Sequence, residues 1–126
     1  MIALDTHALL WWMMEPSRLS RPARRATGEA DRLGVPAIVF WEVALLARRK
    51  RIDLGMSNPA WMREVLSLPR IEVLPITAEI AIEAESLAMH GDPADRFIVA
   101  TARLHQCELV TKDSAIRRAG LATTVW

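Results

Sequence analysis

Acidic residues recur where this 126-residue chain passes from an apolar segment into a helix-like one. Asp5 follows the strand-like "MIAL", and Asp113 follows "ELVT". Glu42 lies near the start of "FWEVALLARRK", and Asp95 lies near the start of "DPADRFIVATARLH". Carboxylates gathered at one place could hold a hard divalent cation or take part in general acid–base chemistry.

The segment "HGDPADRFIVATA" (90–102) contains two acids with different expected tasks. Asp92 precedes Pro93, an arrangement typical of a helix N-cap followed by proline in the first turn. Asp95 lies at helical spacing from Ile98 and Val99, so it leads the stripe that should face the interior. A charge directed at the core needs a partner, which could be a helix dipole, a cationic side chain or a metal.

Short apolar segments alternate with longer helical patterns along the whole chain. Strands are expected at 1–4, 35–39, 71–76, 108–111 and 123–126. Helices are expected at 6–13, 20–33, 40–50, 58–68, 78–89 and 92–105. This alternation predicts an α/β fold with three layers, in which helices cover both faces of a mainly parallel central sheet.

Length and composition set the remaining limits. The chain is long enough for one domain over 1–126, and its 52% hydrophobic content suits a compact core. No segment is long enough to span a membrane and no leader is visible, so a cytoplasmic protein is expected. The net charge of +1 makes no case for a nucleic-acid partner, although local groups such as "ARRKR" (47–51) could contact phosphates.

The acids of the chain have two competing explanations. Each lies near an expected helix start, where a carboxylate caps amides and complements the helix dipole. However, Asp5, Glu42 and Asp113 would all reach the carboxyl edge of a parallel sheet, where the functional crevice of such sheets lies. Four clustered acids repel one another without a cation, which favours Mg²⁺ or Mn²⁺ and phosphodiester hydrolysis.

Four segments resemble the motifs of a known family: "LDTHALLWWM", "WEVALLARRKRIDL", "HGDPADRFIVATA" and "LVTKDSAI". In this order they are similar to the motifs of PIN-domain ribonucleases, specifically the VapC-like toxins of toxin–antitoxin pairs. The resemblance covers the whole chain. It implies an α/β/α PIN fold, Mg²⁺- or Mn²⁺-dependent endoribonuclease activity on RNA, a cognate VapB-like antitoxin, and a homodimer that forms a larger complex with that antitoxin.

Carried over by residue, the resemblance implies a catalytic and metal-binding set of acids: Asp5, Glu42, Asp95 and Asp113. It assigns supporting roles to Thr6, Asp92 and Thr111. Arg96 and Arg49 are candidates for contact with RNA or antitoxin, although Arg96 could instead pair with a neighbouring acid. "PAIVFWE" (36–42) lacks the small hydroxyl residues of many relatives, so Glu42 has the weakest case as a direct metal ligand.

Two rival interpretations use the same residues differently. A haloacid-dehalogenase-like phosphatase would carry a second acid two residues after Asp5, where this chain has His7. A non-catalytic interaction module would use the acids as caps and the apolar helix "ALLWWMM" (8–14) as its binding surface; that helix could equally be wedged in the core. Trp41 and Trp61 are expected in the core or at its edge, and the histidines on the surface.

Overall fold

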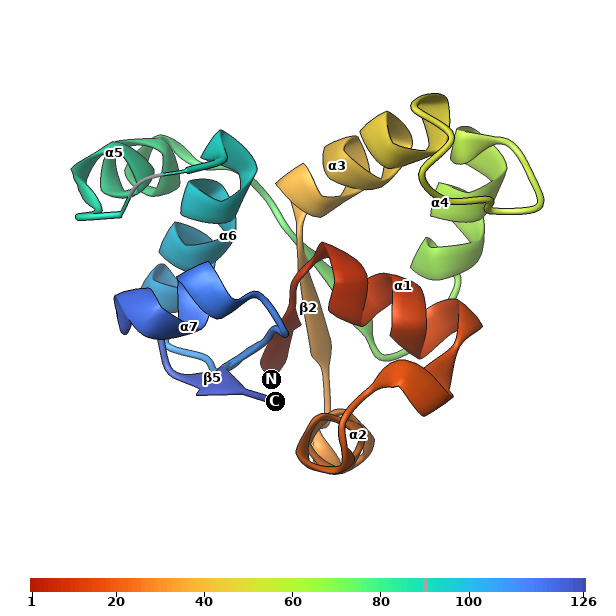
Figure 1. Cartoon of the computed structure of the whole chain (residues 1–126), viewed down its shortest axis with the longest axis horizontal. Coiled ribbons are helices and arrows are strands. Elements are labelled where there is room, and N and C mark those ends of the chain that lie inside the picture. Colours follow the sequence, from red (N-terminus) through yellow and green to blue (C-terminus); the bar gives the residue numbers. More distant parts are fainter. Residues whose placement is uncertain (90) are drawn as a thin grey trace.

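The computed structural model describes residues 1–89 and 91–126, so His90 of the third motif lies outside the described residues. Strands and helices alternate along the chain (Figure 1). In chain order the elements are β1 (Ile2–Leu4), α1 (Thr6–Met14), η1 (Pro16–Arg18), α2 (Arg21–Glu29), β2 (Leu33–Pro36), α3 (Ala37–Arg48), α4 (Asn58–Leu66), β3 (Ile71–Leu74), α5 (Ala78–Ser86), α6 (Pro93–Leu104), β4 (Leu109–Val110), α7 (Ser114–Ala119) and β5 (Thr124–Val125).

The five strands form one parallel sheet in the order β3-β2-β1-β4-β5. In Figure 1, α5, α6 and α7 lie on one side of the molecule and α1, α3 and α4 on the other, with strands between them. The predicted α/β fold with helices on both sides of a parallel sheet is therefore confirmed.

The strand order places a switch in direction at the middle of the sheet. From β1 the chain builds outward through β2 and β3, and it then crosses to the other side of β1 to form β4 and β5. The loops after β1 and β4 therefore diverge, and a crevice opens between them at the carboxyl edge. Asp5 directly follows β1, and Asp113 lies three residues after Val110, the end of β4.

Strands without polar side chains form the centre of the core, because both faces of the sheet are covered. Leu4, Leu33 and Leu109 are fully buried on adjacent strands. Gly34 of β2 is needed for close packing, since a Cβ atom there would lie 2.7 Å from Cδ1 of Leu74. A side chain at this position would force the side chain of Leu74 to move.

The expected helix over 20–33 is too long. α2 ends at Glu29, and the guanidinium of Arg70 donates hydrogen bonds to the carbonyls of Thr27 and Ala30 at its carboxyl end. Leu33 instead pairs with Ile71 as the first residue of β2. Burial between two strands thus overrides the helical pattern of the local sequence.

The bounds of the second strand and the number of helices also differ from the prediction. The second strand covers 33–36 rather than 35–39, because α3 begins at Ala37 directly after Pro36. The short helix α7, Ser114–Ala119, was not among the helices expected from the pattern. Its six residues are too few to show a clear apolar period.

The tryptophans divide between core and surface. Trp61 is buried, as expected, and packs edge-on against Phe40. The expectation for Trp41 is wrong, because 55% of its surface is exposed. Val39 and Val43, one turn apart, form the buried face of α3, and Trp41 lies between them in sequence on the opposite face. Within the described residues, no helix has the length and apolar character needed to cross a membrane.

Candidate active site

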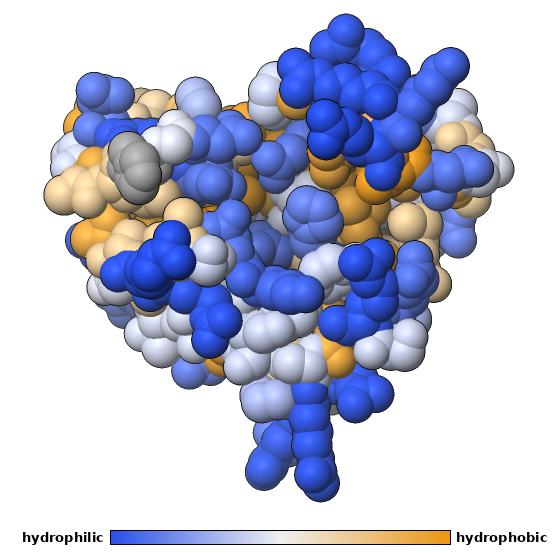
Figure 2. All heavy atoms as spheres, in the orientation of Figure 1, coloured by the Kyte–Doolittle hydropathy of each residue, from blue (hydrophilic) through white to orange (hydrophobic). Residues whose placement is uncertain are grey.

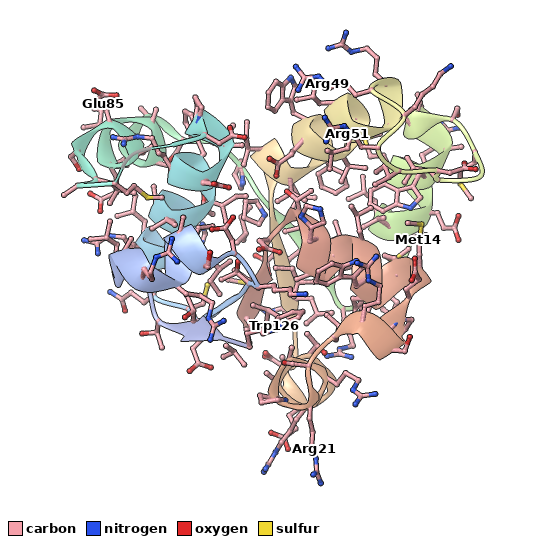
Figure 3. The ribbon with its side chains drawn as sticks, in the orientation of Figure 1. Met14, Arg21, Arg49, Arg51, Glu85 and Trp126 are labelled. Carbon is pink, nitrogen blue, oxygen red and sulfur yellow. The ribbon has the colours of Figure 1, made fainter. Side chains whose placement is uncertain are left out.

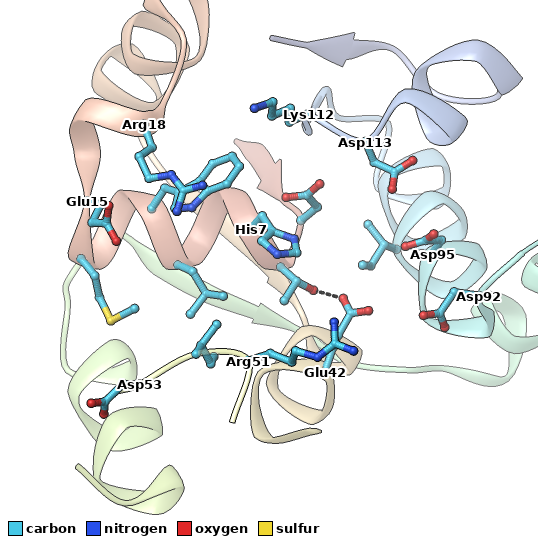
Figure 4. Close-up of a pocket in the computed structure, with 17 residues that line it drawn as sticks. His7, Glu15, Arg18, Glu42, Arg51, Asp53, Asp92, Asp95, Lys112 and Asp113 are labelled. Carbon is cyan, nitrogen blue, oxygen red and sulfur yellow. Dashed lines mark hydrogen bonds between the residues drawn. The ribbon is translucent and has the colours of Figure 1, made fainter. Parts of the chain in front are cut away.

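A cleft of about 900 Å³ opens at the carboxyl edge of the sheet. Figure 2 shows hydrophilic side chains across the middle of this face, between two lobes of the molecule. The four predicted acids all line the cleft, and we call them the acidic cluster: Asp5, Glu42, Asp95 and Asp113. Thr6 and Asp92 line it as well, whereas Thr111 is fully buried behind it. The structure therefore brings together residues that the sequence separates by more than a hundred positions (Figure 4).

Asp5 is fixed by the backbone around it. It follows β1, its amide donates to the carbonyl of Val110, and its carboxylate caps α1 by accepting from the Ala8 amide at 2.7 Å. Only 6% of Asp5 is exposed. Burial raises the pKa of Asp5 to about 6, opposed by hydrogen bonds from Thr111 and Ala8. The cap and the cleft position coexist, so capping does not exclude a further role.

The first turn of α6 carries two acids with distinct environments. Asp92 caps the helix, as predicted, by accepting from the Ala94 amide at 2.9 Å. Asp95 is half-buried, and the pKa of its carboxyl is raised to about 7 by burial and then by the charges of Asp113, Glu42, Asp92 and Asp5. These charges act on Asp95 because the carboxylates face one another across the cleft.

Threonine hydroxyls link the remaining members of the cluster. Thr111 accepts from the Asp113 amide at 3.0 Å and is hydrogen-bonded to the carboxylate of Asp5. Asp113 itself caps α7 by accepting from the Ile116 amide at 2.9 Å. On the opposite wall, the Thr6 hydroxyl donates to the carboxylate of Glu42.

Glu42 reaches the cleft from a different helical turn than expected. The sequence placed it in the first turn of its helix, but α3 begins at Ala37, so Glu42 lies in the second turn. It therefore cannot act as a cap for this helix. Its hydrogen bond from Thr6 supplies the polar support that the preceding apolar residues lack.

The acidic cluster fits an open cation site better than a closed cage. Within residues 1–89 and 91–126, no three acidic, histidine or cysteine side chains are close enough to enclose a metal together. Mg²⁺ keeps several waters and is commonly held by one or two carboxylates plus substrate phosphate. Oxygen donors facing an open cleft match that preference, and a cation would relieve the repulsion between Asp95 and the other acids, which together with burial raises its pKa.

The two predicted contact arginines lie outside the cleft lining. Arg96 places its guanidinium against the end of α5, donating to four backbone carbonyls: Ala84, Glu85, Leu87 and Met89. Four of its five N–H donors are used in this way, and among the described residues it forms no ion pair with an acid. Its contact with RNA or antitoxin stays a prediction. Arg49 is exposed at the end of α3, whereas Arg51 lies nearer the cleft and lines it (Figure 3).

Four further cleft residues bear nitrogen and were not predicted from the sequence: His7, Arg18, Arg51 and Lys112. His7 is exposed, as expected, but Figure 4 shows it between the acids and Arg18. The sequence could have indicated His7 and Lys112 as cleft residues, since each lies within two residues of a predicted site acid. It gave no such indication for Arg18, which enters the cleft only because η1 folds back against α1.

The comparisons with known proteins agree with this geometry. Residues 2–121 match the PIN domain family. The chain is 40% identical over 129 residues to Ribonuclease VapC22 of Mycobacterium tuberculosis, covering 99% of this chain and 98% of that protein.

Similar solved structures include VapBC2 from Rickettsia felis bound to a DNA fragment from its promoter (TM-score 0.70, 16% identity, 98% and 97% of the two chains). A toxin–antitoxin complex from Klebsiella pneumoniae has a TM-score of 0.63, at 22% identity over 90% and 88% of the two chains. The parallel sheet with an acidic cleft at its switch point is thus that of a PIN domain, and the chain belongs to the PIN-domain family. Within that family it is a VapC-like protein, which confirms the resemblance seen in the four motifs.

Proposed function

We propose that this protein is a metal-dependent endoribonuclease and the toxin of a VapBC-like toxin–antitoxin pair. The observation that carries the proposal is the convergence of four carboxylates in one cleft at the switch point of the sheet. The 40% identity to Ribonuclease VapC22 over nearly the full length supports RNA as the substrate.

Each acid has a distinct part in the proposed reaction. Asp5 and Asp95 are the principal metal ligands, Asp113 completes the set, and Glu42 acts directly or through water. When bound, Mg²⁺ or Mn²⁺ supplies charge neutralisation at the scissile phosphate and lowers the pKa of a water nucleophile. Thr6 holds the carboxylate of Glu42 toward the cleft.

The raised pKa values give the acids a proton-linked behaviour. With the pKa of Asp95 at about 7, its carboxyl is partly protonated near neutral pH. Loading with a divalent cation therefore releases a proton and favours the ionised cluster. Thr111 lies behind both acids, since its hydroxyl accepts from the Asp113 amide and lowers the pKa of Asp5.

The proposed assembly is a homodimer of the 1–126 domain, bound by a VapB-like antitoxin in the cytoplasm. The neighbours described as VapBC2 and as a toxin–antitoxin complex support an antitoxin partner. Large apolar side chains exposed on this chain provide surface for both contacts, among them Trp41, Met62, Leu66 and Ile82.

The alternative of a non-catalytic module built on the N-terminal helix is not favoured. Leu9, Leu10 and Trp11 of α1 are buried in the core, so most of that helix is unavailable to a partner. Only Met14, at the end of α1, is an exposed large apolar residue of this helix.

The deciding experiment is cleavage of total cellular RNA by the purified, antitoxin-free protein. Reactions contain Mg²⁺, Mn²⁺ or EDTA, and Asp95→Asn is compared with Glu15→Gln, which removes an exposed acid from the same cleft. We expect discrete cleavage that requires metal and Asp95 but not Glu15. If no condition gives cleavage and metal does not raise the melting temperature, the interaction module replaces the nuclease.

A further inference from the structure

The cleft also contains a pair of cations that lie over one aromatic ring. The guanidinium carbon of Arg18 lies 4.6 Å from the ring centroid of Trp11, and the ammonium nitrogen of Lys112 lies 5.6 Å from the same centroid. We call these three residues the Trp11 platform. All three line the cleft, and both cationic side chains are exposed to solvent.

The indole of Trp11 is itself held rigidly. Its ring lies 5.5 Å from that of Trp126 and 5.5 Å from that of His7, both tilted, and only 9% of Trp11 is exposed. So little exposed surface leaves no room for a base to stack on it. The ring instead presents its electron-rich faces to cations, which keeps Arg18 and Lys112 near it.

Neither cation of the platform is neutralised by a nearby acid. The ion pairs found within the described part of the chain join other residues, and none includes Arg18 or Lys112. Glu15 lies three residues from Arg18 and also lines the cleft, yet Arg18 lies over the indole. The two charges therefore remain available for an anion from outside.

The excess of acidic side chains in the cleft means that a polyanion needs cations there in order to bind. Seven acidic side chains line it, against three permanently charged cations. A polyanion would be repelled by this surface unless cations received part of its backbone. Trp11 of the platform lies on the helix that starts beside Asp5, and six residues of α1 advance about 9 Å along the axis. A strand with one phosphate at the acidic cluster could thus place a neighbouring phosphate at the platform.

We propose that Arg18 and Lys112, positioned over Trp11, bind a flanking phosphodiester of the RNA strand and so fix its position relative to the acidic cluster. This inference rests on the proposed function, since it assigns a binding subsite to the same substrate. The site recognises a phosphate rather than a base, so it contributes affinity and register without reading sequence. Arg18 supplies a planar fork of donors, and Lys112 supplies a point charge.

The test is binding of a fluorescein-labelled, random-sequence single-stranded RNA 12-mer, measured by anisotropy at several salt concentrations. All proteins carry Asp95→Asn and are measured with Mg²⁺, so that the probe stays intact. The variant Arg18→Gln/Lys112→Gln is compared with Arg24→Gln/Arg117→Gln, which removes the same charge from exposed positions outside the cleft.

Losing the neutralisation of one phosphate on a single strand should reduce the salt slope by about 0.7 and the affinity by about 5-fold at roughly 0.1 M salt. The control pair should stay close to its parent. Equal binding by the two double variants would overturn the inference.

A second assay separates the two proposals. It measures cleavage of total RNA by the wild-type protein and by the same double variants with the native Asp95. Cleavage by the wild-type protein together with equal RNA binding by both double variants refutes the subsite and leaves the nuclease intact. Absence of cleavage together with weakened RNA binding by Arg18→Gln/Lys112→Gln refutes the nuclease and leaves the subsite intact.

Discussion

The acidic cluster and the Trp11 platform occupy the same cleft but are held by different means. Asp5 and Asp113 accept from backbone amides, and Glu42 accepts from a threonine hydroxyl, so hydrogen bonds fix these three carboxylates. Arg18 and Lys112 lie over an indole that exerts a weak and less directional attraction. The acidic end is thus preorganised for chemistry, whereas the basic end can adjust to a flexible strand.

The largest expected effect comes from substituting Asp95, the member of the acidic cluster whose pKa is raised the most. Asp95→Asn should lower cleavage by about 1000-fold or more, because a metal ligand is lost. The same change should raise the stability of the metal-free protein near pH 8 by up to about 2 kcal/mol, since it relieves repulsion among half-exposed carboxylates. RNA cleavage and thermal melting of one preparation measure both effects, and an unfolded variant would contradict the assignment.

The second effect comes from removing the indole of Trp11, over which Arg18 and Lys112 lie. Trp11→Ala should lower the free energy of unfolding by about 3–5 kcal/mol, because it leaves a large cavity in the core. Trp41→Ala, at a half-exposed tryptophan, is the matched control and should cost far less. Urea denaturation compares the two variants, and similar losses would mean that Trp11 is not the better-packed ring.

A third effect follows from the raised pKa values of the acidic end. Asp5 and Asp95 have folded-state pKa values of about 6 and about 7, above their ordinary value of 3.8. The folded state therefore binds more protons than the unfolded state between these limits, and its stability falls as the pH rises from about 4 to 7. We expect a total loss of about 2–4 kcal/mol in EDTA.

This pH dependence can be checked by denaturation at pH 5 and pH 8. Mg²⁺ should restore stability at pH 8, because it binds the ionised carboxylates of the folded state. The slope should flatten in Asp95→Asn. A metal-free protein that gains stability over this pH range would show that the carboxylates do not repel one another.

The smallest effect concerns the support of Glu42. Thr6→Val keeps the shape of a buried side chain but removes the hydroxyl that donates to Glu42. We expect a loss of about 1 kcal/mol in stability and a several-fold loss in cleavage, both smaller than for Asp95→Asn. Thr123→Val, at an exposed threonine outside the cleft, is the control. Full cleavage by Thr6→Val would show that Glu42 needs no orientation.

Much of the acidic end was predictable from the sequence. Apolar segments of strand length, each followed by an acid and a helical pattern, place Asp5 and Asp113 at one edge of a parallel sheet. Capping chemistry also identified Asp92 correctly. These signals are local, because strand and helix periods and N-cap preferences act over a few neighbouring residues.

The basic end was not predictable in the same way. Trp11 lies in α1, Arg18 in η1 and Lys112 in the loop after β4, and nothing in their local sequence indicates that they meet. The sequence also suggested that Arg96 pairs with an acid or a phosphate, whereas the carboxyl end of α5 takes its donors. Each of these outcomes depends on which surfaces the crossovers between strands bring together.

The sequence by itself determined the alternation of strands and helices and the positions of the acids within it, since burial periodicity and helix starts are encoded locally. The tertiary structure alone decided the start of α3, the exposure of Trp41 and the meeting of two distant cations on one indole. The physical reason is the strand order β3-β2-β1-β4-β5, which sets every long-range neighbour and is not written in any single segment.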